Sequence, residues 1–358
     1  TKIDLILDLV SQKALQRSKD PLYTFNFFVD WFKKNDKVTG LEKWNEIFLQ
    51  YQRLRDWYAD REIYHRLGYL VSINFPADTL ARIFKFAHPE GKEARSTERI
   101  RKMLNRLIKY SLIIKPEGKF KDVADFKDLK YNCAEDPDNS FDASHHYMIK
   151  RYLTLYNVMV TEKAGKSLRY PFAYHNTVDG GWSLEHIHAQ KSETLNKDWQ
   201  WQQWVATHLE SLNHLLKNQE LDPDLKTRMS SLRERMEEFI KMGKGGEEFK
   251  NISQEFREIM ENLPGATGLY QDEMANMALL GRYDNSTLNN STFDVKRRKI
   301  ISELSTNFVP IATERVFLKA IVNNNETCDT DHLFFWGDKD REVYMSDMEA
   351  KLKDYLSK

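Results

Sequence analysis

The sequence predicts a mainly helical protein with one short strand–loop–strand–helix segment that a long helical insertion interrupts. Apolar side chains recur at three- and four-residue steps through the first 160 residues and again through about 198–263, which is the spacing of one helix face. Two short runs are strand-like instead: one ends at Glu185-His186, and the other covers 277–280. A helix is expected directly after the second run, at about 293–304.

The first 160 residues are expected to form a helical domain. Its aromatic and apolar side chains at helical spacing are interpreted as core positions between packed helices. Capped helices are expected from Asp78 and from Ser96, and a further helix at 147–160. The recurring positions are Trp31, Phe32, Trp44, Ile47, Phe48, Tyr51, Leu54, Trp57 and Tyr58.

The second domain is expected at 161–358, with the insertion at about 191–275. A Val-Asp-Gly-Gly turn at 178–181 leads into the first strand. Gly243 to Gly246 break the helical insertion and are interpreted as a connector, because the strand and the Lys-Ser/Thr ending of a phosphate-binding loop are absent. Helices are also expected near 313–321 and at about 338–355.

Bulk properties indicate a soluble, reduced, cytoplasmic protein without a membrane segment. The 358 residues are 41% hydrophobic and 30% charged, and no long apolar run or signal sequence is present. Cys133 and Cys328 form no CxxC pair and so predict neither a disulfide framework nor a zinc knuckle. Because the chain opens on Thr1, directly into an amphipathic stretch, it is expected to be a piece of a longer protein.

Four polar residues lie on the strand–loop–strand–helix segment and suit hydrolysis of a phosphodiester. His186 can accept a proton from water, as a general base does. Glu185 and Asn285 carry the oxygen ligands that Mg²⁺ prefers, and Mn²⁺ should substitute for it. Asn276 precedes the second strand, and its side chain is expected to hydrogen-bond loop backbone and so hold His186 in place.

Charge gives only local hints of a nucleic-acid partner, since Lys+Arg and Asp+Glu both number 54. The basic stretch 95–109 is interpreted as a solvated helix face. Lys296 and Arg297 lie in the helix near the site and are expected to contact phosphates. His188 is interpreted as structural or substrate-facing, and Asn290 as a helix cap or a nucleic-acid contact.

These residues resemble a known family. Residues 183–190, Ser-Leu-Glu-His-Ile-His-Ala-Gln, resemble the Asp/Glu-His-Ile-x-Pro-Gln element of HNH (ββα-metal, or His-Me finger) endonucleases. Asn276 and Asn285, nine residues apart, and the Phe293-x-x-Lys296-Arg297 run resemble the rest of that motif, best in the version at the C-terminus of GmrSD-type restriction endonucleases. Weaker similarity covers most of the chain.

The resemblance implies a metal-dependent HNH endonuclease of a prokaryotic restriction system that cuts foreign or modified phage DNA. Its partners would be DNA and the N-terminal domain of the parent protein, and NTP would act only through that domain. Two features depart from the family pattern: Ala189 stands where Pro is common, and Lys191 to Ala275 replace a shorter loop.

Two alternatives remain open at the level of sequence. One is a catalytically decayed HNH module that binds DNA or a partner as a regulator. The other is cleavage of RNA, which uses the same chemistry. The filled positions Glu185, His186, Asn276 and Asn285 argue against decay, because a degenerate site is expected to lose His186 or Asn285 first.

Overall fold

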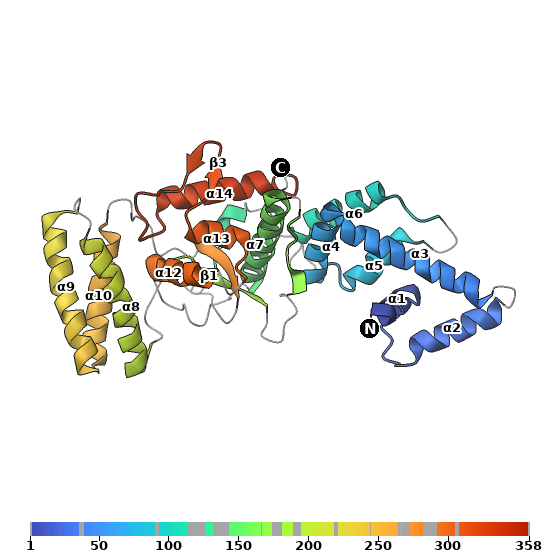
Figure 1. Cartoon of the computed structure of the whole chain (residues 1–358), viewed down its shortest axis with the longest axis horizontal. Helices are drawn as coiled ribbons and strands as arrows, with labels where there is room; N and C mark the ends of the chain where they lie inside the picture. The colour runs from blue at the N-terminus through green and yellow to red at the C-terminus, as the bar shows by residue number, and fades with distance from the viewer. Residues whose placement is uncertain are drawn as a thin grey trace. The chain divides into compact units, whose positions relative to one another are not determined.

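The chain divides into two compact units in a mainly helical computed structural model (Figure 1). Unit 1 comprises residues 1–120, 161–176 and 354–358, and unit 2 comprises 121–160 and 177–353. This division differs from the expected boundary at 160/161, because residues 121–160 belong to unit 2. The structure describes residues 2–35, 39–89, 93–113, 126–131, 143–165, 167–173, 181–188, 195–217, 221–243, 245–263, 266, 273–281, 292–304 and 308–356.

Unit 1 is helical throughout its described part. Polar side chains begin its helices: Thr39 and Glu42 form a capping box, and Asp60 and Ser96 each accept a hydrogen bond from the first turn of the helix that follows. Fully buried Ile63, Leu70 and Leu104 are part of the core. The helices are α1 (Lys2–Val10), α2 (Tyr23–Lys34), α3 (Gly40–Ala59), α4 (Arg61–Ser72), α5 (Thr79–Ala87) and α6 (Thr97–Ser111).

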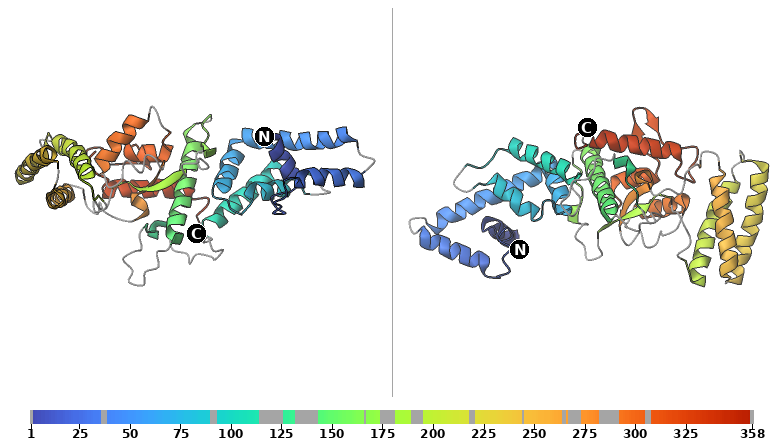
Figure 2. Two further views of the ribbon diagram at one scale, coloured as in Figure 1. Left: turned by 90° about the horizontal axis from the view of Figure 1, so that it is seen from below. Right: turned by 180° about the vertical axis from the view of Figure 1, so that it is seen from behind.

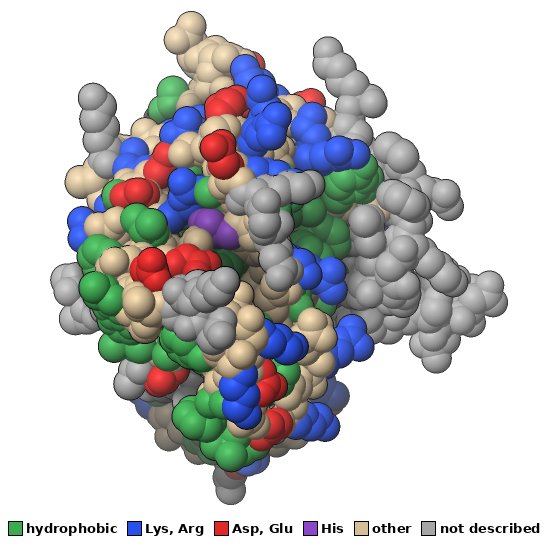
Figure 3. Space-filling view, turned by 90° about the vertical axis from the view of Figure 1, so that its right-hand side faces the viewer, with side chains coloured by type: hydrophobic (Ala, Val, Ile, Leu, Met, Phe, Trp, Pro, Cys, Tyr) green, Lys and Arg blue, Asp and Glu red, His purple; other side chains and the backbone are tan. Residues whose placement is uncertain are grey.

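Many of the aromatic side chains expected in the core of unit 1 are exposed instead. Ile47 and Trp57 are buried as expected, but Trp44 and Phe48 reach solvent, and Tyr58 is 62% exposed. None of the residues of α2 is buried. The reason is that no element of the described chain covers this side of α2 and α3. Figure 3 shows hydrophobic side chains at the surface among Lys and Arg.

Unit 2 holds the short strands and the remaining helices. The predicted helices at 147–160, 293–304, 313–321 and 338–355 and the strand at 277–280 are all found, with bounds shifted by a few residues. Its elements are η1 (Phe126–Asp128), α7 (Ala143–Ala164, of which residues up to 160 belong to unit 2), β1 (Trp182–His186), α8 (Asp198–Leu216), α9 (Pro223–Met242), α10 (Gly246–Glu261), η3 (Met274–Asn276), β2 (Met277–Gly281), α12 (Phe293–Glu303), α13 (Ile311–Phe317), β3 (Val322–Asn323), β4 (Glu326–Thr327) and α14 (Asp338–Leu352).

The insertion between β1 and β2 is a bundle of α8, α9 and α10 around a hydrophobic core to which Phe335 also contributes (Figure 2). Leu212, Met236 and Phe256 are almost completely buried within it. Gly243 ends α9 in the left-handed region at φ 77°, a conformation that favours glycine. In the described part of the chain, no helix has both the length and the apolar character needed to cross a bilayer.

Candidate functional site

The two strands that carry the predicted site pair with each other, although the bundle separates them in sequence. β1 and β2 are antiparallel, with Glu185 opposite Ala278 and His186 opposite Met277. Leu184 is buried in β1, and Met277 to Leu280 are all buried in β2. The hydrophobic run therefore anchors the pair in the interior of unit 2 and brings Glu185 and His186 beside the residue that precedes β2, Asn276.

Asn276 fastens the chain at the point where it leaves β1. Its Oδ1 accepts a hydrogen bond from the His188 N–H at 2.9 Å, and its Nδ2 donates to the His188 carbonyl at 3.0 Å. Its own carbonyl accepts from the Ile187 N–H at 2.8 Å. The expected hydrogen bonding of Asn276 to loop backbone is thus present. Because Asn276 is 1% exposed, water cannot easily replace these bonds.

The helix α12 contacts the end of β1 through Lys296. The Lys296 ammonium forms an ion pair with Oε1 of Glu185 and donates a second hydrogen bond, of 2.5 Å, to the His186 carbonyl. The side chain of Lys296 has no exposed area, and that of Glu185 is 6% exposed. One cation therefore fixes both the carboxylate and the backbone of the predicted base.

This arrangement differs from the expected phosphate contact of Lys296. A fully buried ammonium that is paired with Glu185 cannot reach a phosphate in this conformation. His188, the other predicted contact, is also fully buried, because the bonds to Asn276 hold its backbone in the interior. Burial, with the charges of Lys296 and Arg341, lowers the pKa of His188 to about 3, so its ring is neutral.

Arg297, the other predicted phosphate contact on this helix, remains available for that role. It is half-buried and forms no ion pair with any residue that the structure describes. Its neighbour Arg298 is engaged with Asp294 and Glu210. Of the two predicted phosphate contacts on α12, the structure therefore leaves Arg297 as the candidate.

An aromatic cluster that the sequence did not reveal lies against His186. The Tyr131 ring meets the half-buried His186 ring edge-on, with centroids 4.8 Å apart, and lies 5.3 Å from the ring of His146. Pairing of Lys130 with Glu273 brings Tyr131 to this place. Burial, and secondarily Lys150, lower the pKa of His146. Tyr131 is 55 residues from His186 in sequence, and no motif links them.

The opposite side of α12 is attached to the inserted bundle. Asp294 accepts a hydrogen bond from the Ser211 hydroxyl at 2.5 Å and another from Arg298 at 3.2 Å. The Thr292 N–H donates to Nε2 of His208 at 3.4 Å, while the side chain of Thr292 makes no cap bond. The bundle helix α8 therefore supplies part of the N-terminal capping of α12.

The described residues match a divalent cation only in part. Glu185 provides one hard oxygen ligand, but its Oε1 pairs with Lys296. Across the part of the chain that the structure describes, no three His, Cys, Asp or Glu side chains gather closely enough to hold a metal ion. Asn285, the second predicted ligand, and Asn290 lie outside the described residues.

Comparison with known proteins adds no family to these observations. No family model matches the chain, and neither a curated protein nor a solved structure matches it. Function is therefore inferred from the geometry of unit 2 and from the chemistry of its residues.

Proposed function

We propose that unit 2 is an HNH-type phosphodiester hydrolase that cleaves DNA, with His186 as its general base. The observation that supports this most is the position of Glu185 and His186 at the end of β1, paired with β2 beside Asn276 and packed against α12. A strand–strand–helix frame with an imidazole and a carboxylate at one end suits attack of water on a phosphate. Phage DNA in a prokaryotic restriction system would be its substrate.

In this proposal each residue of the site has a separate role. His186 removes a proton from the attacking water, and a positioned base of this kind typically contributes about 10²–10⁴-fold. Lys296 holds the carbonyl of His186 and Asn276 holds the backbone of His188, and together they orient the His186 ring. Arg297 contacts the phosphate backbone. A bound Mg²⁺ or Mn²⁺, held by Glu185 and Asn285, would neutralise charge on the phosphate and the leaving oxygen.

A second function is favoured by one specific observation. The ammonium of Lys296 already neutralises Glu185, so a cation at this carboxylate must compete with a charge that belongs to the chain. This favours a module that binds DNA or a partner without cutting it. Since RNA cleavage would use the same residues, the test includes both nucleic acids.

The experiment compares nicking of supercoiled plasmid, and cleavage of RNA, by the whole chain in Mg²⁺, Mn²⁺ or chelator. His186→Ala is expected to reduce the rate by about 10²–10⁴-fold because it removes the base. Asn276→Ala is expected to reduce it less, because it alters only the position of His186. The matched control is His214→Ala, at an exposed histidine of the bundle helix α8.

Equal nicking by the wild type and His186→Ala would remove His186 from the mechanism. DNA binding without cleavage by the wild type in either metal would favour the regulatory module. Cleavage of RNA but not plasmid would change the substrate while keeping the site.

A further inference from the structure

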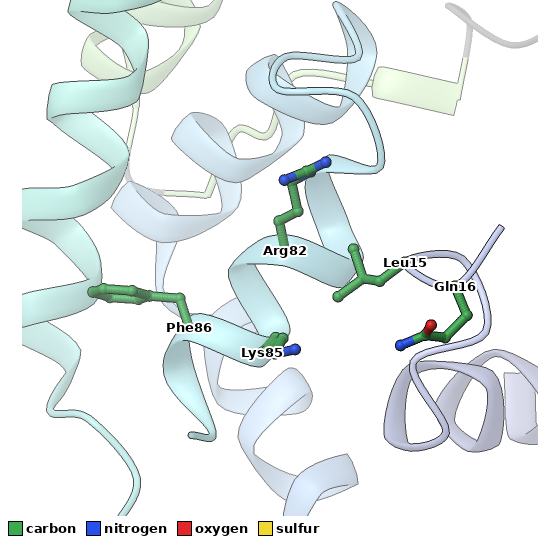
Figure 4. A pocket seen from close by; sticks show the side chains of 5 residues that line it. All are labelled: Leu15, Gln16, Arg82, Lys85 and Phe86. Carbon is green, nitrogen blue, oxygen red and sulfur yellow. The ribbon is translucent and has the colours of Figure 1, made fainter. Parts of the chain in front are cut away.

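Unit 1 contains a hollow that has no part in the proposed hydrolysis. It lies between residues 11–17, which follow α1, and the outer side of α5, and its volume is about 450 Å³. This volume is within the range of about 300–1,000 Å³ typical of small-molecule sites. Its walls are Leu15, Gln16, Arg82, Lys85 and Phe86 (Figure 4). In Figure 4, Lys85 and Gln16 point toward each other from opposite walls.

The two cations of the hollow are not neutralised by the described chain. Neither Arg82 nor Lys85 forms a salt bridge with a described residue, and both are exposed. The one hydrogen bond that Arg82 donates is from Nε to the Ala77 carbonyl, at 2.7 Å, and its terminal amino groups remain open to a ligand. By contrast, several other basic side chains of unit 1 form ion pairs, for example Arg66 with Glu162 and Arg101 with Asp60.

The surroundings of the hollow increase its positive charge. Segments 11–17 and 79–87 together contain Lys13, Arg17, Arg82 and Lys85 and no Asp or Glu, in a chain whose total charge is zero. A concave surface lined by one sign of charge concentrates its field and attracts counter-ions. The hollow is therefore suited to an anion.

Packing holds both walls in place. Leu15 contacts the small core of Leu9, Ala81 and Phe84, which fastens the 11–17 segment to α5. Behind the other wall, the guanidinium of Arg95 lies 3.9 Å from the centroid of the Phe86 ring and also bonds the Phe86 carbonyl. A ligand would therefore meet cations on a frame that is already formed, which reduces the cost of binding.

We propose that this hollow binds a phosphate group. A guanidinium presents a planar fork of donors that matches phosphate oxygens, an ammonium adds a point charge, and the Gln16 amide offers a neutral donor. The group would belong either to the backbone of a nucleic-acid strand or to a free nucleotide. The proposal does not rest on the hydrolysis proposed for unit 2.

The test measures binding of a labelled single-stranded oligonucleotide, of ATP and of inorganic phosphate to the whole chain. Arg82→Gln/Lys85→Gln is compared with Lys33→Gln/Lys34→Gln, which removes the same charge from exposed positions of α2. The first pair is expected to weaken binding about tenfold or more. For the oligonucleotide it should also lower the slope of log affinity against log salt by about 0.7 per lost phosphate contact.

Equal binding by the wild type and Arg82→Gln/Lys85→Gln, an equal loss in the control, or no binding of any probe by the wild type would each overturn the proposal. A selective loss for the oligonucleotide alone identifies a strand as the source, and a loss for ATP or phosphate identifies a free ligand. Probe binding and plasmid nicking are separate readouts of the same variant, so failure of the proposed hydrolysis and failure of this site are distinguishable.

Discussion

Lys296 is the residue on which the geometry of the candidate site depends most. Its buried ammonium contacts the Glu185 carboxylate and the His186 carbonyl, and so links both to α12. A buried ion pair contributes little net stability when compared with apolar residues, but removal of one partner leaves an uncompensated charge. Lys296 therefore acts as a positioning residue for both Glu185 and His186.

Lys296→Met is expected to reduce the free energy of unfolding by about 3–5 kcal/mol, because the Glu185 carboxylate remains buried without its partner. Glu185→Gln/Lys296→Met should recover a large part of this loss, since the amide carries no charge. Urea unfolding of the two variants and the wild type measures both effects. Lys299→Met, at an exposed position of the same helix, is the control and should change stability by less than about 0.5 kcal/mol. An equal effect of Lys296→Met and Lys299→Met would show that the buried pair does not form.

The sequence predicts that Glu185, His186 and Asn276 lie together, and the structure has them side by side, but the sequence does not predict how their neighbours are oriented. Motif spacing identifies which residues share a strand end, and Asn276 bonds the loop as that spacing suggested. It does not say which side of α12 faces the strand, so the sequence predicts a phosphate contact for Lys296, whereas the structure buries this side chain against Glu185. The sequence does not predict the contact between Tyr131 and His186, because only tertiary pairing brings the two rings together.

At the scale of elements, α12 is held from two sides. Lys296 points to β1, while Asp294 and Arg298, two residues before and after it, bond to α8. His208 of α8 stacks on Trp204 at 3.7 Å and accepts the Thr292 N–H. Burial, and secondarily the charge of Arg298, lower the pKa of His208 to about 3, although a hydrogen bond to the Trp204 carbonyl opposes the shift.

Unit 2 is therefore expected to lose stability in acid through His208. The ring takes up a proton below about pH 6.5 in the unfolded chain but only near pH 3 in the folded one, so stability falls as pH decreases through this window. His208→Gln should reduce the difference in unfolding free energy between pH 7 and pH 5 by about 2 kcal/mol. Urea unfolding at the two pH values measures it, with His214→Gln as the exposed control. An unchanged pH dependence in His208→Gln would contradict the assignment.

Helices were the elements that the sequence predicted best, because a repeating apolar face marks each one over several turns. The expected helix at about 293–304 is α12, and the expected strand at 277–280 is β2. The same periodicity could not distinguish a core face from an uncovered one. Trp44 and Phe48 have helical spacing, yet they face solvent because no described element packs over them.

The whole molecule consists of two units that are each assembled from separate segments of chain. Residues 161–176 and 354–358 complete unit 1, and 121–160 complete unit 2. His65 accepts a hydrogen bond from the Tyr170 N–H at 3.1 Å, and Gly68 leaves room for the Phe172 ring, which a Cβ would approach to 2.2 Å. Contacts of this kind between distant segments explain why a single boundary in the sequence did not reproduce the units.

Because each unit has its own core, truncations in the two cores should act separately. Leu104→Ala in α6 and Leu232→Ala in the bundle each remove a fully buried side chain and should cost about 2–5 kcal/mol. Hydrogen exchange read by segment is expected to accelerate in unit 1 for the first variant and in unit 2 for the second. Equal acceleration throughout the chain in both variants would show that the units unfold together.

The bonds between Asn276 and His188 have a consequence for how this chain could have been built. The chain leaves β1 and returns to β2 at the same place. The two ends of the inserted segment therefore lie next to each other. A longer insertion between such ends adds little to the entropic cost of closing the loop. Bundles of different size could be exchanged here by recombination without a shift in strand register. The requirement on any replacement is that it supply partners for Thr292, Asp294 and Arg298.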